Sequence, residues 1–135
     1  MVAKFFAGKR PDSLGVKGNQ LAGCPDSPNC VCSHLSSMDK VHSIDPISYN
    51  SSAAEAIAKI KTIVQAMPKT QIIAETDNYL YAEFTSQLMG FVDDVEFLVY
   101  DNPKVIHVRS ASRLGRSDLG VNRKRIEEIR SQFNR

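Results

Sequence analysis

Apolar and polar residues alternate along four stretches in the second half of the chain. In residues 79–85, Leu80, Ala82 and Phe84 share one face of an extended chain, while Tyr79 and Tyr81 point to the other. Because successive side chains of a strand point to opposite faces, this alternation predicts β-strands. The predicted strands are residues 70–75, 79–85, 91–100 and 105–113, with tight turns at 77–78 and 101–104.

Apolar residues with helical spacing lie on either side of these strands. Ser52 and Glu55 match a capping box, in which the two side chains satisfy free N–H groups at a helix start. The apolar stripe that follows runs to about Met67, and Pro68 ends the helix. A second helix is predicted at about residues 122–133, and a short strand at about 46–49.

The predicted order is therefore (β)-α-β-β-β-β-α. Hairpin strands between two helices are typical of an α+β fold, in which both helices pack on one face of an antiparallel sheet. Residues 1–45 lack periodicity and hold four of the seven glycines, so we expect an irregular segment containing Cys and Pro. We divide the chain into a flexible leader, residues 1–20, and a single α+β domain, residues 21–135.

Length and composition narrow the class of protein. A chain of 135 residues suits one domain, and 42% hydrophobic residues suit a globular core. No apolar run approaches the ~18 residues of a membrane span. Near the N-terminus the run from Phe5 to Ala7 is shorter than the ~7–15 apolar residues of a signal peptide. We therefore predict no membrane span and a cytoplasmic location.

The net charge of +2 conceals two oppositely charged blocks. Residues 71–103 contain seven acidic residues and no Lys or Arg, whereas residues 104–135 contain nine Lys or Arg and three acidic residues. Adjacent blocks of opposite charge neutralise one another in a fold, which argues against a one-sided basic face. We therefore predict no nucleic-acid binding.

The acidic strand and the basic strand that follows it are the main candidates for chemistry. Strand alternation places Asp94 and Glu96 on one face and Asp93 on the other, which disfavours a three-carboxylate metal site. Arg109 and Arg113 share a face of the next strand and are expected opposite the first two carboxylates. Three interpretations remain open: structural ion pairing, an anion site using unpaired arginines, or acid–base catalysis by Asp94 or Glu96.

The start of the last helix favours an anion. Arg123, Lys124 and Arg125 lie in its first turn, where the partial positive charge of the helix end disfavours cations. Asp118, Asp93 or an external phosphate or carboxylate would relieve this conflict. The ordinary alternative is solvated side chains whose stems cover the core.

The cysteines form a compact group with His34 in the sequence CPDSPNCVCSH. The spacing of Cys24, Cys30 and Cys32 lacks the second, distant ligand pair of structural zinc sites, so we predict no metal. Cys24 and Cys30 are candidates for a disulfide or a redox pair, and packed thiols are the alternative. No nucleotide or dinucleotide fingerprint is present, and no cofactor is predicted.

Three blocks resemble the domain-of-unknown-function family numbered 1499: CPDSPNCV at 24–31, FVDDVEF at 91–97, and VRSASRLG at 108–115. The segment DLGVNR at 118–123, with the residues at 125 and 126, completes the match. The resemblance implies relatives in bacteria, including cyanobacteria, and in plant plastids, and it implies no established activity. The candidate ligand-binding residues are Asp94, Glu96, Arg109, Ser110, Ser112, Arg113, Asp118, Asn122, Arg123 and Arg125.

From these observations we predict an accessory or binding module for an anionic small molecule or an acidic protein surface. The first alternative is an enzyme in which Asp94 or Glu96 transfers protons beside Arg109 and Arg113, which requires an open pocket around them. The second alternative is a thiol redox or metal element at Cys24 and Cys30. A sheet face bearing Tyr79 and Tyr81 is a further candidate contact surface, if it is exposed.

Overall fold

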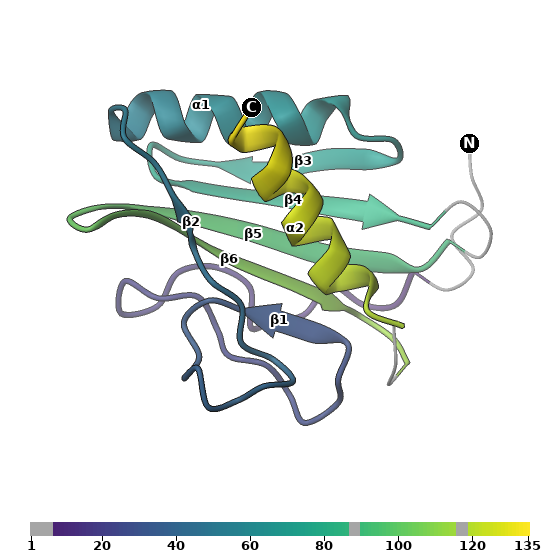
Figure 1. Cartoon of the computed structure of the whole chain (residues 1–135). Helices are drawn as coiled ribbons and strands as arrows, with labels where there is room; N and C mark the ends of the chain where they lie inside the picture. The colour runs from purple at the N-terminus through teal and green to yellow at the C-terminus, as the bar shows by residue number, and fades with distance from the viewer. Residues whose placement is uncertain (1–6, 87–89, 116–118) are drawn as a thin grey trace.

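The computed structural model describes residues 7–86, 90–115 and 119–135. It has the predicted α+β fold with an antiparallel sheet and two helices, and the sheet has six strands where the sequence indicated five (Figure 1). The elements are β1 (Cys30–Cys32), β2 (Ile47–Ser48), α1 (Ala53–Ala66), β3 (Thr70–Glu75), β4 (Tyr79–Thr85), β5 (Val92–Asp101), β6 (Lys104–Ser112) and α2 (Val121–Phe133).

The four long strands form an antiparallel meander. The order across the sheet is β1-β6-β5-β4-β3, and β2 pairs with β6 beside β1. Strand β1 lies within residues 1–45, where the sequence indicated only irregular chain. Its three residues pair with Arg109, Ser110 and Ala111 of β6, so the Cys-containing segment extends the sheet.

Both helices pack on one face of the sheet and bury the main core. The core joins Ile60 of α1 and Ile126 of α2 to Phe97 of β5, all fully buried. In Figure 1, α2 crosses the strands while α1 runs along the β3 edge. The predicted cap is present at the start of α1, where Ser52 Oγ accepts a hydrogen bond from the Glu55 amide at 3.1 Å.

The N-terminal segment covers the opposite face of the sheet. There Leu21 and Cys32 pack with Tyr79, Tyr81 and Leu98 in a second, smaller core. Tyr79 and Tyr81 are only 9% and 4% exposed. The expectation of an exposed tyrosine face was therefore wrong, because a segment without sequence periodicity packs over it.

Residues 7–20 also contact the sheet at defined points. The backbone N–H of Gly15 bonds to Glu96 of β5, and the Arg10 side chain bonds to Glu83 of β4. The division of the chain at residue 20 stays a prediction. Within the described ranges, neither helix is long and apolar enough to span a bilayer.

Candidate functional site

The register of β5 and β6 fixes which charged residues meet. Glu96 lies directly opposite Arg109, and Asp93 lies opposite Ser112. Because alternate side chains point to opposite faces, the candidate residues separate into two groups on the two sides of the sheet. We call the group under the N-terminal segment the ionic cluster: Tyr79, Tyr81, Glu83, Asp94, Glu96, Arg109 and Arg113. We call the group under α2 the helix-anchoring cluster: Asp93, Ser110, Ser112, Asn122 and Arg125.

Arg113 is the centre of the ionic cluster. Its Nε donates to Asp94 Oδ2 at 2.9 Å, and its Nη2 donates to Asp94 Oδ1 at 2.8 Å and also to Glu83. Tyr81 donates its hydroxyl to the same Asp94 Oδ1. The side chains of Arg113 and Asp94 are 7% and 1% exposed, so this two-pronged ion pair is almost fully removed from water.

Glu83 belongs to this cluster, although sequence reasoning missed it. Glu83 is on β4, directly opposite Asp94 of β5. It also forms an ion pair with Arg10, whose Nη2 is 2.6 Å from Glu83 Oε2. Burial raises the pKa of Glu83, but hydrogen bonds from Arg10 and Arg113 outweigh burial and hold the pKa below its ordinary value. The alternation of β4 was the available signal, because it places Glu83 on the face of the two tyrosines.

Glu96 is the carboxylate of the ionic cluster whose burial is least offset by hydrogen bonds and ion pairs. Its Oε2 accepts the Gly15 N–H at 2.8 Å and the Tyr79 hydroxyl. Its Oε1 accepts no hydrogen bond from any described residue and lies 3.7 Å from Arg109 Nη1. Burial therefore raises the pKa of Glu96, against the lowering effects of Tyr79, Gly15 and Arg109.

The ionic cluster is closed to solvent. Asp94 and Glu96 are 1% and 0% exposed, and Arg109, 5% exposed, also donates from Nε to the Gly23 carbonyl at 3.1 Å. The acid–base hypothesis required an open pocket around these carboxylates. Their burial and pairing speak against that hypothesis and favour structural ion pairing.

The helix-anchoring cluster links α2 to β5 and β6. Arg125 Nη2 lies 2.7 Å from Asp93 Oδ2, and Arg125 Nη1 donates to Ser110 and Asn122. Asn122 is fully buried and donates from Nδ2 to Ser112 Oγ at 2.9 Å. One predicted anion for the first turn of α2, Asp93, is therefore present within the fold. The other, Asp118, lies outside the described residues.

Arg123 is separate from both clusters. Its Nη2 donates to the Val41 carbonyl at 3.0 Å, and it forms no ion pair with a described carboxylate. It lines a cavity of about 260 Å³ between α2 and residues 33–46. Three hydroxyl-bearing residues, Ser33, Ser37 and Ser43, line the same cavity.

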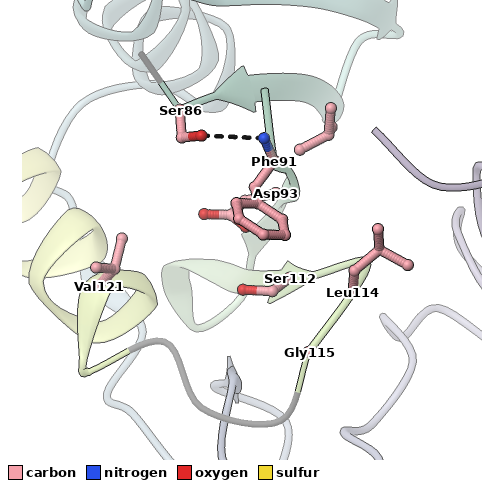
Figure 2. Close-up of a pocket in the computed structure, with 8 residues that line it drawn as sticks. Ser86, Phe91, Asp93, Ser112, Leu114, Gly115 and Val121 are labelled. Carbon is pink, nitrogen blue, oxygen red and sulfur yellow. Dashed lines mark hydrogen bonds between the residues drawn. The ribbon is translucent and has the colours of Figure 1, made fainter. Parts of the chain in front are cut away.

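A different pocket opens at the start of α2, at the end of the sheet (Figure 2). It has a volume of about 230 Å³ and draws residues from β5, β6, α2 and the chain next to them. The described residues that line it are Ser86, Phe91, Val92, Asp93, Ser112, Leu114, Gly115 and Val121. Among the predicted site residues that the structure describes, only Ser112 lines it. Sequence reasoning missed the others because the apolar residues lie beside loops, where strand and helix patterns end.

The cysteines divide into a bonded pair and a free thiol. Cys24 and Cys30 form a disulfide with their Sγ atoms 2.06 Å apart. Cys32 is buried with a free thiol, and burial raises its pKa. The described residues contain no group of three or more His, Cys, Asp or Glu able to hold a metal ion.

Comparison with protein-family models identifies the family of this chain. The family described as "Protein of unknown function (DUF1499)" matches residues 20–133. The chain therefore belongs to this family, as the sequence blocks had indicated. No match was found among curated proteins.

Proposed function

We propose that this member of the DUF1499 family is a binding module whose ligand site is the pocket at the start of α2. The observation that carries the proposal is the apolar rim of that pocket. Phe91, Leu114 and Val121 are 39%, 41% and 44% exposed, yet they gather around one opening. Exposed apolar side chains that gather in this way are typical of binding sites, whereas scattered ones need no explanation.

The pocket is a better ligand site than the ionic cluster for a physical reason. Ligand sites are usually concave and mainly apolar, with a few polar groups that fix orientation. The pocket has this character, with Asp93 and Ser112 beside its apolar rim (Figure 2). The arginines of the ionic cluster are engaged with Asp94, Glu83 and Glu96, and a ligand would have to displace those partners.

The proposal is tested by small aromatic probes and a variant that fills the pocket. Saturation-transfer-difference NMR would be recorded with benzamide, benzoate and benzylamine. Val121→Phe places a ring at the pocket, whereas Val41→Phe adds the same ring at a 52% exposed position outside it. We expect at least one probe to bind the wild type and Val41→Phe but not Val121→Phe. If no probe distinguishes the two variants, the proposal is overturned.

An anionic ligand is a second candidate, at the cavity that Arg123 lines. The specific support is that Arg123 is not ion-paired with a described carboxylate and faces hydroxyl-bearing residues. Asp45 and Glu127 line the same cavity and oppose an anion, although Glu127 is paired with Arg130 at 2.9 Å. An acidic protein surface would use the same arginine.

Thermal shift measurements test this second candidate. Phosphate, a nucleotide and a dicarboxylate would each be added to the wild type, Arg123→Ala and Lys124→Ala. Lys124 is the matched control, because it is an exposed neighbour on the same helix turn. Stabilisation that disappears only in Arg123→Ala supports an anion site. Equal shifts in all three proteins rule it out.

The cellular location bears on the cysteines. We propose a cytoplasmic location, as the sequence predicts, and disulfides are rare in the reducing cytoplasm. A cytoplasmic chain would hold Cys24 and Cys30 as thiols most of the time. In an oxidising compartment Cys24 and Cys30 would form the bond that the structure contains.

A further inference from the structure

We infer that the polar end of the ligand is an uncharged group that both donates and accepts hydrogen bonds, such as a carboxamide or a hydroxyl. This inference rests on the proposed function, because it describes the ligand of the same pocket. It follows from one acceptor atom and one donor group beside the apolar rim that no described residue engages, and from the charges around them.

The acceptor is Asp93. Its Oδ2 is held by Arg125 Nη2 at 2.7 Å, whereas no described residue donates to its Oδ1. The side chain is 13% exposed, and the residue lines the pocket. A ligand that offers an N–H or O–H group would satisfy Oδ1.

The donor is Ser112, directly opposite Asp93 on β6. Its Oγ already accepts the Asn122 Nδ2 hydrogen at 2.9 Å, so its second role must be donation. The Ser112 hydroxyl has no acceptor among the described residues, and the residue lines the pocket (Figure 2). A carbonyl or hydroxyl oxygen on the ligand would accept this hydrogen.

The charged groups around the pocket disfavour both anionic and cationic ligands. A carboxylate has no hydrogen to offer Asp93 and would place two anionic oxygens together. A cation would find Asp93 already neutralised by Arg125. It would also approach the first turn of α2, which carries basic residues and no acidic one. An uncharged group with both a donor and an acceptor avoids both costs.

The apolar part of the ligand must be small. The volume of about 230 Å³ lies below the roughly 300–1,000 Å³ of pockets that enclose drug-sized ligands. Phe91, Leu114 and Val121 offer contacts to a single ring or a short branched chain. The ligand class is therefore a small aromatic or aliphatic amide or alcohol.

Isothermal titration calorimetry with three matched probes tests the inference. Benzamide, benzoate and benzylamine share one ring and differ in the polar end. We expect benzamide to bind the wild type about tenfold more tightly than either charged probe, since a hydrogen bond to a charged group contributes about that factor. Asp93→Asn would pair its oxygen with Arg125 and present an N–H to the pocket. The preference for benzamide over benzoate should then fall by about tenfold.

The outcomes separate this inference from the proposed function. Equal affinities, or a wild-type preference for benzoate or benzylamine that Val121→Phe abolishes, would overturn the inference and leave the proposed function standing. Binding of no probe at the pocket would overturn both. The wild-type ranking needs no variant, so the inference remains falsifiable even if Asp93→Asn fails to fold.

Discussion

At the scale of single residues, identical side chains have different roles because of burial and neighbours. Arg113 is sealed between two carboxylates, Arg125 pairs with one carboxylate under α2, and Arg123 lines a cavity without an ion pair to a described carboxylate. The sequence predicted that Arg109 meets Glu96, because strand alternation and a short hairpin determine that pairing. It could not predict the contacts of Glu83 or Arg10, because these come from other segments that meet only in the folded chain.

Loss of Arg113 should be strongly destabilising. Arg113→Met would leave the negative charges of Asp94 and Glu83 buried without the guanidinium that pairs with both. Removing one partner of a buried ion pair costs about 3–5 kcal/mol. Urea denaturation of both proteins measures the loss. Arg10→Ala serves as a control at the rim of the same cluster, since the Arg10 side chain is 53% exposed, and should cause a much smaller loss. Equal losses for the two variants would contradict the structural role of Arg113.

Glu96 should make the stability depend on pH in a specific direction. Burial raises its pKa in the folded state, so the folded protein holds this proton at pH values where the unfolded chain has released it. The favourable contribution of protonated Glu96 to the free energy of unfolding is therefore complete at pH values below the pKa of Glu96 in the unfolded chain. It is lost as the pH rises through the pKa of Glu96 in the folded protein. The stability of Glu96→Gln relative to wild type should increase over that window.

The measurement is urea denaturation of wild type and Glu96→Gln from pH 4 to pH 8. Glu75→Gln is the control, because Glu75 is 41% exposed in a surface ion pair with Lys61. A difference between wild type and Glu96→Gln that stays constant across this range would show that the buried carboxyl does not titrate as described.

At the scale of elements, α2 shows how polar side chains attach a helix to a sheet. The sequence predicted its bounds to within one residue from the apolar stripe. Its N-cap is Gly120, which makes no side-chain capping hydrogen bond. Attachment comes instead from Asn122 and Arg125, which reach Ser110, Ser112 and Asp93 on the sheet. The sequence indicated this conflict of basic residues at a helix start and offered Asp93 as one possible partner, which the structure places beside Arg125.

Asn122 should be the most sensitive polar residue of α2. Asn122→Ala would remove hydrogen bonds to Ser110, Ser112 and the Asn29 carbonyl, and each buried polar group left without a partner costs about 1–3 kcal/mol. Thermal and urea denaturation should both show this loss of stability. Lys124→Ala, on the exposed side of the same turn, should change stability by less than about 0.5 kcal/mol. If Asn122→Ala does not change the free energy of unfolding, α2 is held by its apolar stripe alone.

At the scale of the whole molecule, the sheet is covered on both faces by different means. The helices cover one face through periodic apolar residues, which the sequence displayed and which made the α+β order predictable. The N-terminal segment covers the other face through individual contacts, such as Gly15 with Glu96 and Gly23 with Arg109. Those contacts leave no periodic signal, which explains why the tyrosine face was expected to be exposed. The pocket escaped prediction for a similar reason, since it forms where elements end.

The disulfide should contribute to holding this arrangement. It closes a loop between residues six positions apart, for which loop-closure entropy gives about 2 kcal/mol. Reduction, or Cys24→Ser with Cys30→Ser, should lower the free energy of unfolding by about that amount. Intact mass with and without reductant verifies the redox state. If the mass shows that the bond has been reduced and the free energy of unfolding does not change, the disulfide does not stabilise the fold.

We propose that the charged clusters stabilise the fold and that the pocket at the start of α2 binds a ligand. The most direct test is a ¹H–¹⁵N correlation spectrum of the full chain titrated with benzamide. We predict saturable shifts at the amides of Phe91, Asp93, Ser112 and Val121, which line the pocket. Shifts centred instead on Asp94 and the rest of the ionic cluster would contradict the account.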